Sequence, residues 1–212
     1  MTPPDRRTSP HRREGTVPAP HRIDRLTARI DRLTAADYPD TVKGLAGLLV
    51  DAVDDNASVG FLAPFDQDAA VAWWQSRAPA VADGTLAVWV CRDTDGTTGG
   101  NGIVGTVGLA FTGNPNGRHR AEVVKLIVHR EARGRGIARA LLATAEAAAT
   151  AAGITLLLLD TRTGSTAERV YAADGWTRYG VVPDYAGDPD GSLAHCSFFY
   201  KQLAAPTAPA GG

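Results

Sequence analysis

Cysteine, net charge and long apolar runs are all scarce in this sequence, and each absence excludes a class of protein. Two cysteines among 212 residues are too few for a disulfide framework, and they lack metal-ligand spacing. The 22 basic residues balance 23 acidic ones, so no overall positive field attracts nucleic acid. No stretch approaches the ~20 apolar residues of a membrane span, and no apolar stretch follows the basic N-terminus as in a secretory signal. We therefore expect a cytoplasmic monomer or homodimer with no metal, nucleic-acid or membrane partner.

The two ends of the chain differ in composition from the rest. Residues 1–22 hold five arginines and five prolines but almost no large apolar side chains. Such a segment cannot bury enough apolar surface to offset the entropy lost on ordering. We predict a disordered basic arm at 1–22, one folded domain at 23–203, and a disordered Ala/Pro/Gly-rich tail at 204–212.

The first half of the predicted domain combines strands with amphipathic helices. Asp37-Tyr38-Pro39 is typical of a helix start, with an N-cap residue and a proline in the first turn. A loop at 58–66 carries several apolar side chains, which indicates that it folds over another part of the protein. The expected elements are a strand at 29–33, helices at 37–53 and 67–81, and a hairpin of strands 86–92 and 103–111 joined by a turn at 93–101.

The second half has the order of a parallel crossover. A buried-type strand at 121–128 leads through a glycine turn into an alanine-rich helix at 137–152, and a strand at 155–159 follows. Ser165 and Glu168 form a capping box that begins a short helix ended by Gly175. Segments 176–182 and 197–201 are expected to form a final antiparallel pair.

The stretch from Val128 to Arg139 holds the clearest chemical signal. A strand enters a turn containing Gly134 and Gly136, and a long helix follows at once. The first turn of a helix has N–H groups without partners and the positive end of the dipole, while glycines allow a phosphate to come close. Four arginines add positive charge around the turn. The pattern predicts a pyrophosphate-binding loop.

Two other interpretations of this turn stay open, and one is excluded. A Walker A loop is excluded because its Gly-x4-Gly-Lys-Ser/Thr pattern is absent. A dinucleotide-binding fingerprint fits Gly134 and Gly136, with Asp160 as the ribose-binding acid, although Arg139 is large for the third glycine position. A turn that only connects a strand to a helix is the third interpretation.

The same residues resemble the GNAT superfamily of N-acetyltransferases. Residues 133–138 (RGRGIA) match the Arg/Gln-x-x-Gly-x-Gly/Ala signature, with Ala138 in place of the commoner glycine. Residues 123–128 are similar to the splayed strand before that loop, and 167–176 are similar to the Ala-x-x-x-Tyr-x-x-x-Gly-Phe segment. Within the superfamily, segments 159–165, 180–186 and 197–201 resemble the tabtoxin-resistance type of small acetyltransferase.

The resemblance implies a GNAT fold, an α+β protein layered α/β/α, whose mixed, mostly antiparallel central sheet contains a parallel βαβ unit that binds acetyl-CoA. Backbone amides of the loop would hold the pyrophosphate, Arg130 or Arg135 would reach the phosphates, and the strand backbone would pair with the pantetheine arm. Gly164 stands where many members carry a cofactor-binding asparagine, so either Ser165 would take that contact or this contact is missing. The implied cofactor site consists of Leu126, Ile127, Val128, Arg133, Gly134, Arg135, Gly136, Ile137, Ala138, Arg139 and Ser165.

Acetyl transfer from a thioester to an amine needs a base for the amine and an acid for the leaving thiolate. Tyr171 matches the tyrosine that protonates the CoA thiolate in many GNAT enzymes, although periodicity alone favours an aromatic residue packed on the sheet. Glu122 has the spacing of the catalytic glutamate in some members. It is predicted to share a strand face with the apolar row Val124, Leu126 and Val128, which would raise its pKa. An exposed charge at a strand end is the alternative.

The predicted substrate walls are Phe61, Trp89, Asp160 and Tyr185, and Asp160 would bind the substrate ammonium. Phe61 and Trp89 are equally explained as core residues, and Asp160 as a turn residue. We expect direct transfer to a primary amine of a small molecule of antibiotic or toxin type. A protein lysine or N-terminal amine acetyltransferase is the alternative with the same fold. A non-catalytic module that senses acyl-CoA is the alternative of another class.

Overall fold

A computed structural model describes residues 28–93 and 102–204. The predicted basic arm, the tail beyond residue 204 and nearly all of the 93–101 turn lie outside these residues. The strands are β1 (Ala28–Arg32), β2 (Leu86–Asp93), β3 (Ile103–Phe111), β4 (Arg120–Val128), β5 (Leu156–Arg162), β6 (Thr177–Gly187) and β7 (Leu193–Gln202). The helices are α1 (Tyr38–Asp54), α2 (Gln67–Gln75), α3 (Ala78–Ala82), α4 (Ile137–Ala151) and α5 (Thr166–Ala173), with short 3-10 turns at Pro115–Gly117 and Arg130–Ala132.

The seven strands form one sheet in the order β1-β2-β3-β4-β5-β7-β6. Neighbouring strands are antiparallel except β4 and β5, which are parallel and joined through α4. The predicted fold class, an α+β layered protein with a mostly antiparallel sheet and one parallel βαβ unit, is confirmed.

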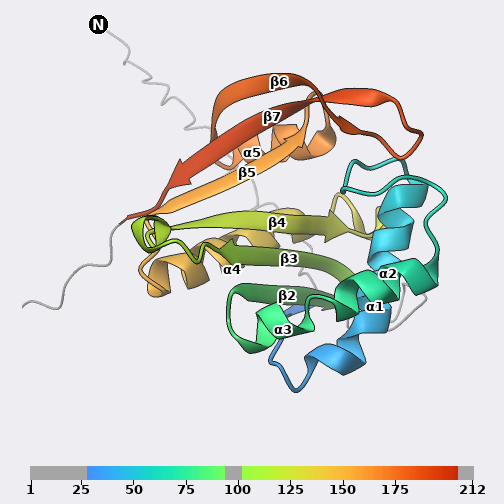
Figure 1. Ribbon diagram of the computed structural model, residues 1–212, viewed down its shortest axis with the longest axis horizontal. Helices are drawn as coiled ribbons and strands as arrows, with labels where there is room; N and C mark the ends of the chain where they lie inside the picture. Colours follow the sequence, from blue (N-terminus) through green and yellow to red (C-terminus); the bar gives the residue numbers. More distant parts are fainter. Residues whose placement is uncertain (1–27, 94–101, 205–212) are drawn as a thin grey trace, which may run out of the picture.

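Helices cover both faces of this sheet (Figure 1). On one side, here the α1 face, Leu49 and Trp74 pack with Val88 of β2 in a core cluster that α1 and α2 share with the sheet. On the other side, here the α4 face, Leu141 of α4 and Tyr171 of α5 join a second cluster. Because β2 is covered on both faces, its sequence is a continuous apolar run rather than an alternating one.

Two helix predictions need correction. The span 67–81 forms two helices, because Pro79 has no N–H to continue the helical ladder and its ring clashes with the preceding turn. Asp37 precedes α1 as predicted, but its side chain makes no capping bond to the helix. It instead accepts a hydrogen bond from the Thr34 hydroxyl at 2.6 Å.

A bulge interrupts β4 at Lys125. One β3 residue, Val107, lies opposite two β4 residues, Lys125 and Leu126. Lys125 has a φ of 50°, in the left-handed region that residues with side chains rarely adopt. The extra residue reverses the alternation of the strand, so that Val123 before it and Leu126 after it both pack on the α4 face.

The strands β4 and β5 pair over only part of their length. Arg120 to Glu122 pair with Leu156 to Leu158, and the strands diverge beyond these residues (Figure 1). We call this separation the β4–β5 split. Backbone groups of β4 that face β5 along the split lack the sheet partners that they have on the β3 side.

Candidate active site

The glycine loop lies at the end of β4 that borders the split. Gly134 and Gly136 have φ values of 77° and 80°, which a residue with a side chain adopts only at a cost. A Cβ at either position would meet no atom within 4 Å, so backbone conformation rather than crowding requires glycine there. The first backbone bond of α4 runs from Ala140 N to Gly136 O at 3.1 Å. The preceding N–H groups of the first turn therefore have no partner within the helix, and they form an anion-binding end.

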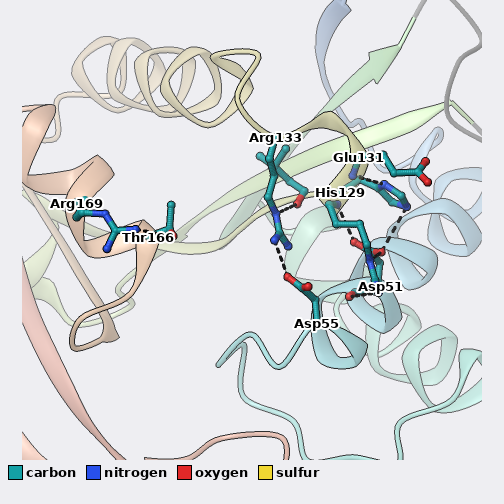
Figure 2. A network of polar contacts seen from close by, with 9 residues as sticks. Asp51, Asp55, His129, Glu131, Arg133, Thr166 and Arg169 are labelled. Atoms are coloured by element: carbon teal, nitrogen blue, oxygen red, sulfur yellow. Dashed lines mark hydrogen bonds and ion pairs between the residues drawn. The ribbon is translucent and has the colours of Figure 1, made fainter.

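Two carboxylates at the end of α1 hold arginines beside this loop, and Figure 2 shows one of these pairs, Arg133 with Asp55. The Arg130 Nε lies 2.5 Å from Asp51 Oδ1, and the Arg130 backbone N–H donates to the other Asp51 oxygen at 3.0 Å. The Arg133 guanidinium lies 2.5 Å from Asp55. These ion pairs join the end of α1 to the segment that leads into the glycine loop.

The expectation that Arg130 or Arg135 reaches the phosphates stays a prediction. Arg135 pairs with Asp93 at 3.3 Å, and the Asp93 side chain is fully buried. Both guanidinium groups therefore already lie on carboxylates. Arg139 is freer, because its side chain is 66% exposed and its contact with Asp174 is as long as 3.9 Å. Arg169 of α5 is also exposed and donates to the Thr166 hydroxyl at 3.0 Å; Figure 2 shows it across from Arg133.

Tyr171 lies on the buried side of α5. Its ring contacts Trp176 and Phe199 at centroid distances of 5.9 and 6.0 Å, and the residue is 5% exposed. Burial raises the pKa of its hydroxyl well above the usual value, and the negative charge of Asp160 raises it further. Tyr171 is thus both the packed aromatic residue that periodicity favours and a phenol that stays protonated at neutral pH.

Glu122 is the last β4 residue paired with β5, where the split begins. Its predicted place in one apolar row with Leu126 and Val128 is wrong, because the bulge turns those two side chains to the α4 face. The Glu122 pKa is nevertheless raised, first by desolvation and then by the charge of Asp160. Glu122 is therefore a carboxyl group that holds its proton to higher pH than an ordinary surface glutamate.

Asp160 lies on β5 just beyond the paired segment. It is exposed, and its Oδ2 accepts a hydrogen bond from the Cys196 thiol at 3.1 Å. Burial and this bond to the carboxylate raise the pKa of Cys196 to about 12, so the thiol stays protonated and acts as a donor. The negative charge of Asp160 affects both Glu122 and Tyr171, and Asp160 therefore links the two predicted catalytic groups.

The predicted substrate residues are only partly brought together. Phe61 lies 5.2 Å from the Lys125 ammonium, and that ammonium interacts electrostatically with Asp160. Tyr185 stacks edge-on to Phe198 at 5.0 Å, and Phe198 is the β7 residue that pairs with Asp160. Trp89 is separate from these residues.

Trp89 lies in the core cluster of the α4 face, where it is 4% exposed. The α1 face of β2 is instead lined by Val88 and Val90. The alternation of the strand therefore directs Trp89 away from Phe61, and we do not include it in the proposed substrate wall.

Ser165 serves first as the cap of α5. Its hydroxyl accepts from Glu168 N at 3.1 Å. The Glu168 carboxylate accepts from Gly164 N at 2.6 Å, one residue before the position that a capping box predicts. A role for Ser165 toward a cofactor stays a prediction.

Lys125 and Cys196 are the two residues near the site that the sequence prediction missed. A lysine within the apolar run VVKLIV was a usable signal of an irregular strand. Cys196 gave no signal, because its contact with Asp160 joins residues 36 positions apart. Among the described residues, no group of three metal-binding side chains is found. None of the helices in this part of the chain is long and apolar enough to cross a membrane.

An anion-binding loop at the end of a strand that parts from its parallel neighbour is suited to a phosphate-bearing ligand lying along the split. Comparison with known families gives the particular class. The acetyltransferase (GNAT) family profile matches residues 45–176. The chain belongs to this family, and the protein is an acetyltransferase of the GNAT type.

Solved structures agree in fold. The Salmonella typhimurium acetyltransferase candidate yncA, solved with its cofactor acetyl-CoA, is 20% identical, with a TM-score of 0.65 over 86% of this chain and 98% of that one. A candidate phosphinothricin N-acetyltransferase is 16% identical, with a TM-score of 0.66 over 84% and 99%. A ribosomal-protein-alanine N-acetyltransferase from Brucella melitensis is 24% identical, with a TM-score of 0.61 over 82% and 99%. At these identities the likeness establishes the fold alone.

Proposed function

We propose that this protein transfers an acetyl group from acetyl-CoA to a primary amine of a small molecule, by direct attack with both substrates bound. The N–H groups at the start of α4 that have no partner within the helix suit a pyrophosphate. Arg139 of α4 and Arg169 of α5, which Figure 2 shows across from Arg133, add exposed positive charge. The β4 backbone along the split offers the hydrogen-bonding edge that a pantetheine arm needs. The acetyl-CoA in the Salmonella structure supports this choice of coenzyme.

The observation that carries the proposal is the arrangement around Asp160. Glu122 pairs with Leu158, two residues before Asp160 on β5, and Tyr171 packs in the same core cluster as Leu159, the neighbour of Asp160. The negative charge of Asp160 contributes to the raised pKa of both groups. A carboxylate pair and a protonated phenol thus lie around one point of the sheet. These are the groups that an amine acylation requires.

When bound, acetyl-CoA supplies the acetyl group as a thioester. Ionised Glu122 accepts a proton from the ammonium of the acceptor, which leaves the nitrogen lone pair free to attack. Asp160, held by the Cys196 thiol, attracts that ammonium and orients it. The C–N bond would form first, and as the C–S bond then breaks the Tyr171 hydroxyl would donate its proton to the departing sulfur. The second proton leaving the acceptor nitrogen would return to the Tyr171 oxygen, which yields a neutral amide, a free thiol and the original phenol.

Calorimetric titration with acetyl-CoA, NAD and ATP tests the coenzyme. We expect binding of acetyl-CoA alone, and binding of NAD alone would instead support the dinucleotide interpretation. Release of free thiol is then measured with phosphinothricin, a panel of small primary amines, and a peptide that begins with alanine. Turnover of small amines supports the proposal. Turnover of the peptide alone supports a protein acetyltransferase, and tight acetyl-CoA binding without any turnover supports a sensing module.

A further inference from the structure

The loop after α1 forms a connection between the two parts of the sheet that the split separates. We call residues 58–66 the strap. At its start, the Val59 carbonyl accepts a hydrogen bond from the Lys125 ammonium of β4 at 2.6 Å. Further along, Ala63 N donates to Pro189 O, in the turn between β6 and β7, at 2.8 Å. Figure 1 shows the strap passing from the end of α1 to the tip of the β6–β7 hairpin.

The far attachment of the strap is packed closely. A Cβ added to Gly187 would lie 3.3 Å from a methyl group of Leu62, so the strap rests on the backbone of β6 at this point. Leu62 itself is 57% exposed, whereas Phe61 and Phe65 are partly buried against the α1-face cluster. Phe61 and Phe65 therefore hold the strap against the sheet, while the Leu62 side chain stays on the surface of the protein.

Lys125 is the near attachment, and its surroundings are unusual for a lysine. The side chain is largely enclosed, and its ammonium lies 5.2 Å from the Phe61 ring centroid and 5.1 Å from that of Trp73. Burial lowers its pKa, while the charge of Asp160 acts in the opposite direction. Enclosing an ammonium is costly unless its donors and charge are used. The Lys125 ammonium donates a hydrogen bond to the strap carbonyl, and its charge is stabilised by the two aromatic rings and by the negative charge of Asp160.

The bulge explains how Lys125 reaches this position. Without the extra residue, the alternation of β4 would turn a side chain at 125 to the α4 face, together with Ala121 and Val123. With it, the ammonium lies against the strap. The bulge therefore supplies one anchoring side chain that contacts Phe61 and interacts electrostatically with Asp160.

We propose that Lys125 is a positioning residue for the acceptor amine, because it anchors the strap as the wall of the amine site opposite Asp160. This inference rests on the proposed acetyl transfer. Lys125 touches neither reacting atom in this scheme. It fixes the Phe61 side of the site, and the strap thereby limits which amines can reach Glu122.

The test compares Lys125→Met, which keeps an unbranched side chain one atom shorter but removes its charge and donors, with Lys125→Arg, which keeps the charge and the donors. Lys43→Met is the matched control, since Lys43 is an exposed lysine on α1. Each purified variant is examined by hydrogen exchange of the 58–66 peptide, acetyl-CoA titration and steady-state kinetics. The amine is the best acceptor found in the panel above.

We expect Lys125→Met to raise strap exchange and the KM for the amine by about tenfold or more, because a charged hydrogen bond is lost. The acetyl-CoA Kd and kcat should stay within about threefold of wild type. Lys125→Arg should recover most of the amine KM, and Lys43→Met should match wild type. An unchanged amine KM in Lys125→Met overturns the inference, whether or not strap exchange rises.

A fall in kcat with an unchanged amine KM also overturns it. If Lys125→Met does not fold, Leu62→Ala loosens the far attachment instead, and an unchanged amine KM in that variant has the same meaning. Failure of the proposed function itself is distinguishable, because wild-type protein would then neither bind acetyl-CoA nor release thiol.

Discussion

The two faces of the sheet contribute to the candidate site in different ways. On the α4 face, the anion-binding end consists of backbone N–H groups within one short segment, 134–139. On the α1 face, Glu122, Lys125, Asp160 and the strap come from separate parts of the chain and meet through side chains. A site that uses the backbone is encoded locally, whereas a site that uses side chains depends on the tertiary fold. Substitutions should therefore affect the two faces differently.

The largest effect should come from the backbone-encoded part. Gly136→Val replaces a residue at φ 80° and places a side chain where the first-turn N–H groups point, so acetyl-CoA binding should weaken about 1000-fold. Gly84→Val is the control, because Gly84 is an exposed glycine at φ 78° elsewhere in the chain. Calorimetry measures both. Equal losses of affinity in the two variants would mean that backbone strain, not the anion site, causes the effect.

Tyr171→Phe tests whether the buried phenol acts chemically or only packs. The phenyl ring preserves the contacts with Trp176 and Phe199, so Tm and both KM values should change little. Loss of the proton donor should lower kcat about 100-fold. Tyr179→Phe, at an exposed position, is the control and should keep full activity. A Tyr171→Phe enzyme with wild-type kcat would leave the residue with a packing role only.

The pH profile tests the electrostatic link through Asp160. The base must be ionised, so kcat/KM should fall as pH drops through the raised pKa of Glu122. Glu122→Gln should abolish this acid limb. Asp160→Asn removes a negative charge that raises the pKa of Glu122, so the acid limb of the profile should move to lower pH. An acid limb that stays in place would show that Asp160 does not act on Glu122.

The smallest effect should come from the ion pair at the border of the two faces. Asp55→Asn releases the Arg133 guanidinium from a partly exposed pair, so Tm should change little. Removing a competing negative charge beside the loop should tighten acetyl-CoA binding about two- to threefold at low salt. The gain should disappear at high salt. Titrations at two ionic strengths measure this, and a salt-independent change would point to a rearranged loop instead.

The contrast between the faces also explains how much could be predicted. The glycine loop, the start of α4 at Ile137 and the strand at 103–111 follow from local sequence, and the structure has them as predicted. The crossover from β4 to β5 was also correctly predicted. In these segments, turn chemistry and periodicity act over a few residues and agree with the tertiary fold.

The failures involve contacts between distant segments. The bulge at Lys125 turns Leu126 and Val128 to the opposite face of β4 from Glu122. The strict alternation of side chains along a strand does not predict such a reversal. Asp51, 79 residues away in sequence, binds Arg130, and the local sequence gave no sign of this contact. Trp89 was placed in the substrate wall because composition alone cannot assign a β2 residue to one of two buried faces. The apolar residues of the strap predict that it folds over another part of the protein, but they do not identify that part.

The short parallel ladder has a mechanical consequence. The sheet consists of two shells, β1 to β4 and β5 to β7, and three register pairs form the seam between them. A ligand lying along the split would hydrogen-bond to both shells, and its binding free energy would then oppose their parting. Such a ligand would stiffen the whole molecule by closing one seam. Opening of the free protein at the seam would also have to separate the α4-face core, which contains residues of β2 and β4 together with residues of β5 and β7, and to release the strap from one of its two attachments.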